Sequence, residues 1–305
     1  MREESVVWPN FFIVGAPKCG TSSLYVYLSA HPQVFFPVLK EPHFFSLASA
    51  PEYLNRDHRW FYRCCGNRDE YNRIYESARG FPAIGDGSTS YLWDKDAAKR
   101  IYAVTPDAKI VIILRDPILR AHSHYLANHA ADMNKASFMQ EIRDDLAMEN
   151  RDWWNSHLYV DLGMYCDQIR RYLDTFGRDN VLILVTEDLN ERHKEVLSKL
   201  TQHLGIDPFP ETVEFAETVH NPYRAPRAKG LYHVVKNAFS FRLRTALLPE
   251  SVNGWLRNSK LLYSNDKPIL EDEPRRLLQE IFEPEMRCVE KLLSRELPAL
   301  RKSWK

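Results

Sequence analysis

A short loop near the amino terminus carries residues that bind phosphate. Residues 11–15 form the apolar run FFIVG, and four residues separate Gly15 from Gly20, the spacing of a P-loop. Glycines let the backbone approach an anion closely, and Lys18 lies inside the loop. Three hydroxyl residues follow the second glycine, namely Thr21, Ser22 and Ser23. The alternative is a plain strand-to-helix turn capped by Thr21, but the lysine and the hydroxyls favour a phosphate site.

The position of the lysine indicates which kind of phosphate site this is. In P-loop triphosphatases the lysine follows the second glycine, and the next Ser or Thr holds magnesium. Here Thr21 follows Gly20, and Lys18 comes two residues before that glycine. The sequence therefore disfavours a kinase that uses ATP and magnesium. It also contains no C-x-x-C pair and no H-E-x-x-H run that would suggest a metal site.

A second candidate phosphate ligand stands at the end of a later apolar run. The segment KIVIILR, residues 109–115, ends in Arg115. A guanidinium can give two charge-assisted bonds to one phosphate. The alternative is an ion pair between Arg115 and Asp116 or a surface acid. The residues of this segment alone leave both interpretations of Arg115 open.

Alternating strands and helices must position these residues. Apolar runs rich in Val, Ile and Leu predict buried parallel strands at 11–15, 109–115, 180–185 and, as a weaker strand, 82–86. Helical patterns cover 21–30, 94–104, 117–130, 162–176 and about 273–295, with a kink expected at Pro284. This order predicts an α/β fold, a P-loop-type central parallel β-sheet flanked by helices. Its ligands should bind at the carboxyl ends of the strands.

We expect a single domain over residues 1–305, made of a nucleotide-binding core (11–205), a basic loop and lid (206–270) and a C-terminal helix (271–305). Within the lid, residues 224–260 contain several Lys and Arg side chains against the acid Glu250. This stretch is either a lid for an anionic substrate or membrane surface, or a solvated amphipathic helix that closes over the site.

Composition excludes several classes of function. The 305 residues are 44% apolar, which is enough for a core, and 41 Lys and Arg balance 41 Asp and Glu. A zero net charge argues against a general nucleic-acid or membrane-surface binder. No run of about 18 apolar residues predicts a membrane span, and residues 1–10 do not form a signal peptide. We therefore expect no stable membrane insertion and a cytoplasmic protein.

The cysteines give the same expectation about compartment. Their number is odd, and their positions show no disulfide framework: Cys19, Cys64, Cys65, Cys166 and Cys288. Unpaired thiols in a reducing compartment are the prediction from this pattern.

The segments PKCGTSSL and VIILRDPILRAHSHY together resemble the two nucleotide motifs of sulfotransferases that use 3′-phosphoadenosine 5′-phosphosulfate (PAPS). The resemblance is to the heparan-sulfate-type and related bacterial enzymes. It extends over most of residues 11–230 and includes KEPHFFS (40–46), GDGSTSYL (85–92) and NPYRAPRAKG (221–230).

This resemblance implies a site for PAPS, with 3′,5′-ADP as the product and no metal required. The 5′-phosphosulfate side would be held by Lys18, Cys19, Gly20, Thr21, Ser22 and Ser23. The 3′-phosphate side would be held by Arg115, by Ser123 eight residues later, and by Arg227 and Lys229. Lys18 would stabilise the leaving phosphate. Glu41 would be the general base, with His43 as the alternative base.

The sequence departs from the family pattern at the acceptor side. Many glycosaminoglycan enzymes carry an acid–lysine pair where this chain has Asp86 and Gly87, and a proline where it has Thr89. No counterpart of the late disulfide of the secreted enzymes is expected. The acceptor is a hydroxyl compound, with a carbohydrate as the first expectation and a lipid, phenol or other small alcohol as the alternative. A non-catalytic nucleotide-binding protein also remains open, no nucleic-acid partner is expected, and the sequence leaves the oligomeric state undetermined.

Overall fold

Five short apolar segments form one parallel sheet. The computed structural model describes residues 6–46, 64–131, 133–153, 157–210, 225–226, 263–264 and 267–304. The strands follow the order β2 (Val34–Phe35), β3 (Ala83–Asp86), β1 (Phe11–Gly15), β4 (Lys109–Leu114) and β5 (Val181–Val185). Each neighbouring pair is parallel. The predicted central parallel sheet is therefore confirmed.

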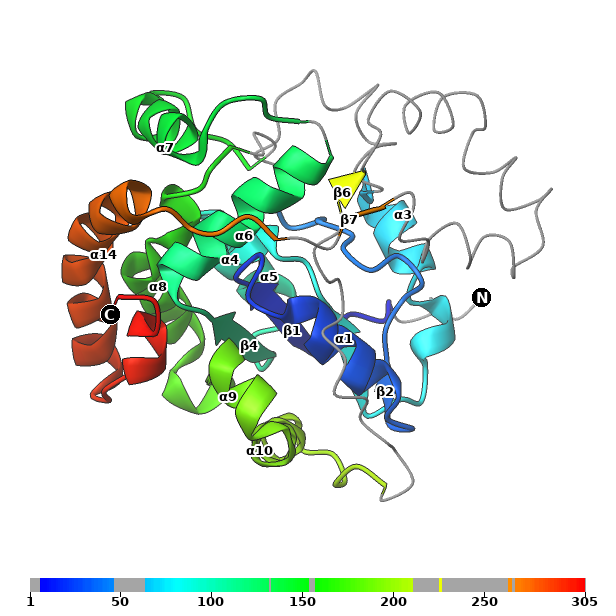
Figure 1. Ribbon diagram of the computed structural model, residues 1–305. Coiled ribbons are helices and arrows are strands. Elements are labelled where there is room, and N and C mark those ends of the chain that lie inside the picture. Colours follow the sequence, from blue (N-terminus) through cyan, green and yellow to red (C-terminus); the bar gives the residue numbers. More distant parts are fainter. Residues whose placement is uncertain are drawn as a thin grey trace.

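Helices cover both faces of this sheet (Figure 1). One side carries α5 (Ala97–Val104), α8 (Tyr165–Phe176) and α14 (Asp272–Leu293). The other side carries α1 (Thr21–Ser29), α9 (Thr186–Glu191) and α10 (His193–Leu204). Around these lie α3 (Arg68–Arg73), α4 (Ser90–Trp93), α6 (Pro117–Ala130) and α7 (Phe138–Ala147), with short 3₁₀ turns η3 (Glu76–Ala78), η4 (Asp161–Gly163), η5 (Arg178–Asn180) and η6 (Pro298–Arg301). Strands buried on both faces explain the continuous apolar runs in the sequence.

The strand order places a ligand site between β1 and β4. After β1 the chain builds β2 and β3 on one side of it, and it then returns to build β4 and β5 on the other side. At such a switch point the loops after the two central strands separate and leave a crevice at the carboxyl ends. The glycine loop follows β1 and Arg115 follows β4, so the topology brings the two predicted phosphate ligands to the same crevice.

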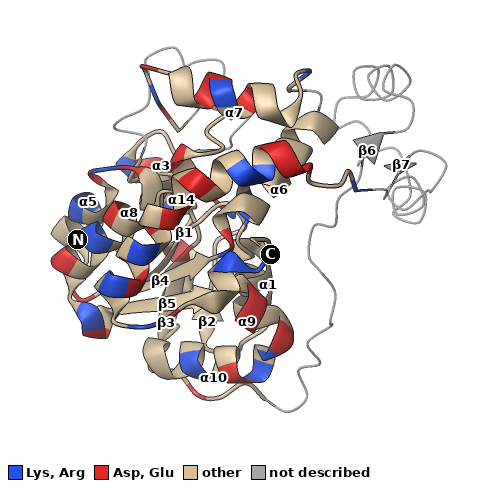
Figure 2. Ribbon diagram, turned by 60° about the vertical axis from the view of Figure 1, so that its left-hand side comes forward, with Lys and Arg blue, Asp and Glu red and all other residues tan. Residues whose placement is uncertain are grey.

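The core lies around the two central strands. All five residues of β1 are buried, as are residues 110–114 of β4. Most charged side chains lie outside this core, although Asp86, Asp116 and Arg120 are buried. Figure 2 shows basic and acidic residues interspersed over the helices of the face that it presents. Among the described residues, none of the helices combines the length and apolar character that crossing a membrane requires.

The prediction that the cysteines are unpaired is wrong at two positions. Cys166 in α8 and Cys288 in α14 form a disulfide, with their Cα atoms 5.8 Å apart. The two residues are 122 positions apart in sequence, so nothing local reveals the pair. Packing of α14 along α8 brings them together. The odd cysteine count therefore no longer supports the expectation of a reducing compartment.

The helix predicted at 94–104 begins three residues later, as α5 at Ala97, and the separate short helix α4 precedes it. Asp94 stands between α4 and α5, and its Oδ1 accepts hydrogen bonds from the amides of Asp96 and Ala97. An aspartate that satisfies the first amides of a helix marks the start of that helix. The last helix, α14, contains Pro284 and is one continuous element from Asp272 to Leu293.

Most of the predicted basic lid, residues 206–270, lies outside the described residues. Two fragments within it, β6 (Ala225–Pro226) and β7 (Tyr263–Ser264), pair in antiparallel fashion. The candidate 3′-phosphate ligands Arg227 and Lys229 also lie outside the described residues, so their predicted role stays a prediction.

Candidate functional site

Backbone geometry explains the glycines of the phosphate loop. Gly20 precedes α1 with φ 91° and ψ 12°, a left-handed conformation that favours glycine. Gly15 ends β1, and a Cβ atom there would lie 2.7 Å from Leu92 Cβ. The amide of Ser23 donates to the Gly20 carbonyl, which starts the helix. A tight turn therefore delivers the amino end of α1 to the crevice, where helix amides favour an anion.

Neighbouring strands hold this loop in place. Arg115 Nη1 donates to the Lys18 carbonyl at 3.2 Å, so the two phosphate candidates are in direct contact. Tyr165 Oη donates to the Arg115 carbonyl at 3.1 Å. Thr186, the first residue after β5, donates from Oγ1 to the Cys19 carbonyl at 2.5 Å. The loop after β1 is thus tied to the ends of β4 and β5.

The Cys19 side chain points away from the crevice into the core. Its side chain is fully buried, and its Sγ lies 3.6 Å from Tyr165 Oη. Burial raises the pKa of this thiol to about 11. Cys19 can therefore contribute its backbone to a ligand, and its thiol is part of the packing.

Several cations converge on the crevice, and one of them, Arg120, has guanidinium nitrogens that no described residue satisfies. Burial lowers the pKa of Lys18, and the charges of Arg115, Arg120 and Lys40 lower it further. Arg120 is fully buried and donates through Nη2 to the Tyr159 carbonyl. Among the described residues, no acceptor satisfies Arg120 Nε or Nη1. A buried guanidinium without a counter-ion is costly, so this cluster fits an anionic ligand.

Arg115 is not paired with the aspartate beside it. Asp116 is fully buried, and its Oδ1 accepts two amides from the first turn of α6. Its Oδ2 accepts the amide and hydroxyl of Ser303, both at 2.8 Å. Both oxygens are therefore occupied, and the alternative of an Arg115–Asp116 ion pair fails. Ser123 lies on α6, half-buried, as the predicted helix required.

The candidate base lies next to the phosphate loop. Lys40 Nζ donates to Ser22 Oγ at 2.6 Å and lies 3.3 Å from Glu41 Oε1. Thr89 Oγ1 donates to Glu41 Oε2 at 3.0 Å, and His43 Nε2 lies 3.5 Å from the same oxygen. The structure therefore brings both base candidates together and joins them to α1 through Lys40.

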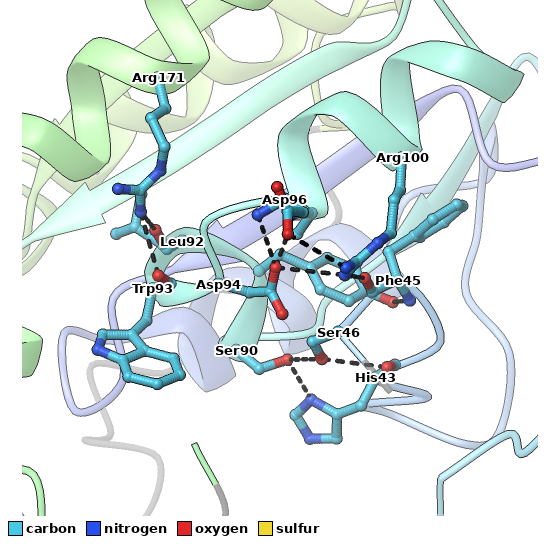
Figure 3. Close-up of polar contacts among 12 residues, drawn as sticks. His43, Phe45, Ser46, Ser90, Leu92, Trp93, Asp94, Asp96, Arg100 and Arg171 are labelled. Atoms are coloured by element: carbon cyan, nitrogen blue, oxygen red, sulfur yellow. Dashed lines mark hydrogen bonds and ion pairs between the residues drawn. The ribbon is translucent and has the colours of Figure 1, made fainter. Parts of the chain in front are cut away.

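His43 is buried beside the short helix α4 (Figure 3). Its Nδ1 lies 2.6 Å from Ser90 Oγ, and its amide donates to Ser88 Oγ at 3.0 Å. Burial lowers the pKa of His43, and the charge of Glu41 opposes that effect. The ring also lies 6.0 Å, between centroids, from the ring of Trp153. A histidine buried and neutral in this way can accept a proton.

Asp86 at the end of β3 anchors this part of the site. Its Oδ2 accepts from Tyr71 Oη at 2.8 Å and from Tyr91 Oη at 2.9 Å. Its Oδ1 accepts the amide and hydroxyl of Ser88, which in turn receives the His43 amide. Burial raises the pKa of Asp86 to about 6, against the effect of these bonds. Asp86 therefore supports the loop that carries His43.

Several residues of the site were not assigned a role from sequence. Tyr165 and Thr186 act through the backbone of the loop, and their contacts depend on helix and strand packing. The sequence offered one indication for Thr186, because a polar residue directly after a buried strand lies at the edge of the sheet where ligands bind. Arg120 lies on the same helix as Ser123, five residues after Arg115, and only its burial shows that it belongs to the cation cluster.

Comparison with known proteins assigns this arrangement to a class. Residues 9–211 match the model of the sulfotransferase family. The chain belongs to this family and is an enzyme of the sulfotransferase class. A solved sulfotransferase from Alicyclobacillus acidocaldarius is 29% identical, with a TM-score of 0.73 over 97% of this chain and 100% of that chain.

The chain is also similar in sequence to curated sulfotransferases. Carbohydrate sulfotransferase 15 of Mus musculus is 27% identical over 261 residues, which cover 68% of this chain and 45% of the relative. The mouse bifunctional heparan sulfate N-deacetylase/N-sulfotransferase 3 is 27% identical over 215 residues, which cover 66% of this chain and 22% of the relative. The chain therefore spans less than half the length of either relative.

Proposed function

We propose that the protein transfers a sulfuryl group from PAPS to a hydroxyl group of a carbohydrate. The observation that carries this proposal is the cation cluster of Lys18, Arg115 and Arg120 at the carboxyl ends of β1 and β4. The carboxylate of Glu41 lies 3.3 Å from Lys40 Nζ, which donates to Ser22 Oγ at the start of α1. An anion site beside a candidate base is what transfer from a phosphosulfate requires.

The residues of the crevice fit PAPS. The unsatisfied guanidinium nitrogens of Arg120 and the lowered pKa of Lys18 both favour a bound anion. Lys18 and the amino end of α1 would hold the 5′-phosphosulfate. Arg115 and Ser123 would hold the 3′-phosphate, with Arg227 and Lys229 as proposed further ligands. When bound, PAPS supplies the sulfuryl group.

The side chains then have separate tasks. Lys18 places a positive charge beside the oxygen that leaves with the phosphate, and this interaction strengthens as charge develops there. Glu41 accepts the proton of the acceptor hydroxyl, while Thr89 and Lys40 fix the two oxygens of its carboxylate. The crevice orients donor and acceptor for in-line transfer.

The names of the curated relatives support a carbohydrate acceptor. They are described as a carbohydrate sulfotransferase and as an enzyme of heparan sulfate. Gly87 stands where many glycosaminoglycan enzymes carry lysine, so the acceptor of this chain need not be a glycosaminoglycan. A lipid or phenolic alcohol is the second candidate.

Transfer of label from radiolabelled PAPS to a panel of glycans, lipids and phenols tests the proposal. Labelled glycan supports it, labelled lipid or phenol alone would replace the acceptor class, and no transfer would overturn it. Thermal stabilisation by 3′,5′-ADP in excess chelator, and none by ATP with magnesium, separates the sulfotransferase from a kinase.

Replacement of Glu41 by Gln tests the base. Glu41→Gln should lower kcat by about 10²–10⁴-fold, because the amide keeps the shape and loses the basicity. The affinity for 3′,5′-ADP, measured by calorimetry, should stay nearly unchanged. His43→Asn is measured beside it: near-normal turnover of Glu41→Gln with an inactive His43→Asn would assign the base to His43 instead.

A further inference from the structure

Three hydrogen-bond contacts form a closed chain around the imidazole of His43. His43 Nδ1 lies 2.6 Å from Ser90 Oγ, and Ser90 Oγ lies 2.7 Å from Ser46 Oγ. Ser46 Oγ returns to the His43 carbonyl oxygen at 3.1 Å. Figure 3 shows these contacts as one continuous path between α4 and the loop of residues 41–46.

All three residues of this chain are buried, and Ser90 is fully so. Two oxygen atoms at hydrogen-bond distance attract each other only where a hydrogen lies between them. The direction of the chain can therefore be deduced by counting hydrogens. A carbonyl oxygen can only accept, so the hydroxyl hydrogen of Ser46 goes to the His43 carbonyl. Ser46 Oγ must then accept from Ser90, because each hydroxyl has one hydrogen. Ser90 Oγ, having given its hydrogen to Ser46, must accept from His43 Nδ1.

The reverse direction leaves one contact without a hydrogen. If Ser46 donated to Ser90 and Ser90 donated to Nδ1, the oxygen of Ser46 would face the His43 carbonyl oxygen at 3.1 Å with nothing between them. That carbonyl already accepts the Ser46 amide, also at 3.1 Å. Two hydrogens cannot satisfy three contacts, so the first direction is favoured.

We propose that Ser90 and Ser46 are positioning residues that hold neutral His43 with its hydrogen on Nδ1, so that Nε2 is the proton-accepting nitrogen beside Glu41. This inference rests on the proposed function for its role in the reaction. Nε2 lies 3.5 Å from Glu41 Oε2, longer than a normal hydrogen bond. The charged groups that act on the ring are Glu41 and Lys40.

The tautomer gives Glu41 a second acceptor for its proton. As the acceptor oxygen bonds to sulfur, the bond between sulfur and the 5′-phosphate oxygen breaks, and the acceptor's proton goes to Glu41. Nε2 can take that proton over only if it carries no hydrogen of its own. The resulting imidazolium keeps its Nδ1–H bond to Ser90, so no other proton has to move.

Nitrogen-15 NMR of the histidine ring tests the tautomer directly and needs no activity. In full-length protein labelled at histidine, the His43 signals are assigned by their loss in His43→Gln. Above the pKa of His43, Nδ1 should show the shift and coupling of a protonated nitrogen, and Nε2 those of an unprotonated one. The opposite pattern in the wild-type protein would overturn the proposal. Absence of sulfuryl transfer would affect the proposed function and leave this result standing.

Ser46→Ala separates positioning from simple packing. Without Ser46, the hydroxyl of Ser90 has a hydrogen available for Nδ1, so the population with hydrogen on Nε2 should rise. We expect kcat to fall on the order of tenfold, less than removal of the base itself, with unchanged affinity for 3′,5′-ADP. Thr175→Val, which removes a hydroxyl bonded to the Arg171 carbonyl on α8, is the matched control. A shift of the tautomer in the control, or none in Ser46→Ala, would contradict the proposed path.

Discussion

At the scale of single residues, Lys18 and Arg115 are linked by a hydrogen bond and by the repulsion of their charges. Arg115 donates to the Lys18 carbonyl while its carbonyl receives Tyr165, and the charge of Arg115 helps to lower the pKa of Lys18. Each residue therefore affects the other before any ligand arrives. A substitution of either residue should therefore be tested both for nucleotide binding and for its effect on the geometry of the phosphate loop.

Arg115→Ala should weaken 3′,5′-ADP by about 1.5–3 kcal/mol, the scale of a hydrogen bond to a charged group. Binding of 5′-AMP should change far less, because that nucleotide lacks the 3′-phosphate. Titration calorimetry with both nucleotides measures the difference. Arg178→Ala, which removes a surface arginine bonded to the Leu292 carbonyl, is the control. An equal loss for both nucleotides would mean that Arg115 acts only through the Lys18 backbone.

Binding of 3′,5′-ADP should take up a proton at alkaline pH. The lowered pKa of Lys18 means that it loses its proton in the free protein below the usual value of 10.5. An anion favours the charged form, so the ligand raises this pKa and affinity should fall as pH rises through that window. Calorimetry at about pH 9 in two buffers of different ionisation enthalpy counts the proton.

Lys18→Arg is the control for this proton, because arginine stays charged. Its complex should form without proton uptake. Uptake of the same size in Lys18→Arg would show that another group titrates.

At the scale of elements, four strands of the sheet could be predicted, and the edge strand β2 could not. The runs at 11–15, 109–115 and 180–185 are apolar throughout, because β1, β4 and β5 lie inside the sheet order or under helices. Strand β2 has only two residues, too few for a pattern, and was missed. The start of α5 at Ala97 rather than at residue 94 depends on the side-chain contacts of Asp94, which a periodic pattern does not reveal.

The same distinction holds for the site. Lys18 could be predicted from its position in the glycine loop, whereas Arg115 needed the family resemblance in addition to its position after a buried strand. The Asp86 network joins α3, β3 and α4, so its members are known only when these elements are packed. The disulfide escaped prediction for the same reason, since two helices distant in sequence create it.

The carboxyl group of Asp86 should make stability depend on pH in an unusual direction. Its pKa is raised from 3.8 to about 6, so the folded state binds more protons than the unfolded state between these values. Its contribution to stability is therefore greatest below pH 3.8 and declines as pH rises through about 6. From pH 5 to pH 7 the loss should be about 1 kcal/mol.

Asp86→Asn separates the pH-dependent contribution of Asp86 to stability from the contributions of the other carboxyl groups. Urea unfolding at pH 5 and pH 7 gives the difference in free energy of unfolding between wild type and variant. The wild type should lose more than the variant on going to pH 7. A difference that does not change with pH would show that Asp86 titrates near its ordinary pKa.

At the scale of the whole molecule, α14 and the segment after it close the fold. The disulfide fixes α14 to α8, and the segment after α14 reaches Asp116 through Ser303. Residues near the end of the chain thus support elements in its middle, and α8 in turn contacts β4 and β5.

Cys288→Ser should lower the free energy of unfolding by about 2–5 kcal/mol, because the disulfide closes a long loop in the unfolded chain. Chemical denaturation with and without reductant measures the effect. Reductant should destabilise the wild type and leave Cys288→Ser unchanged. Cys64→Ser, outside the disulfide, should behave like the wild type. An unchanged midpoint in reduced wild-type protein would show that the disulfide adds nothing to stability.

The bonds between Asp116 and Ser303 also set an order of events during synthesis. The two residues are 187 positions apart. At about 5–20 residues per second, the ribosome makes Ser303 roughly 10–40 s after Asp116. Throughout that interval Asp116 Oδ2 lacks the two hydrogen bonds that Ser303 donates in the folded protein. Asp116, the residue next to Arg115, can therefore complete its hydrogen bonds only after Ser303 has been made.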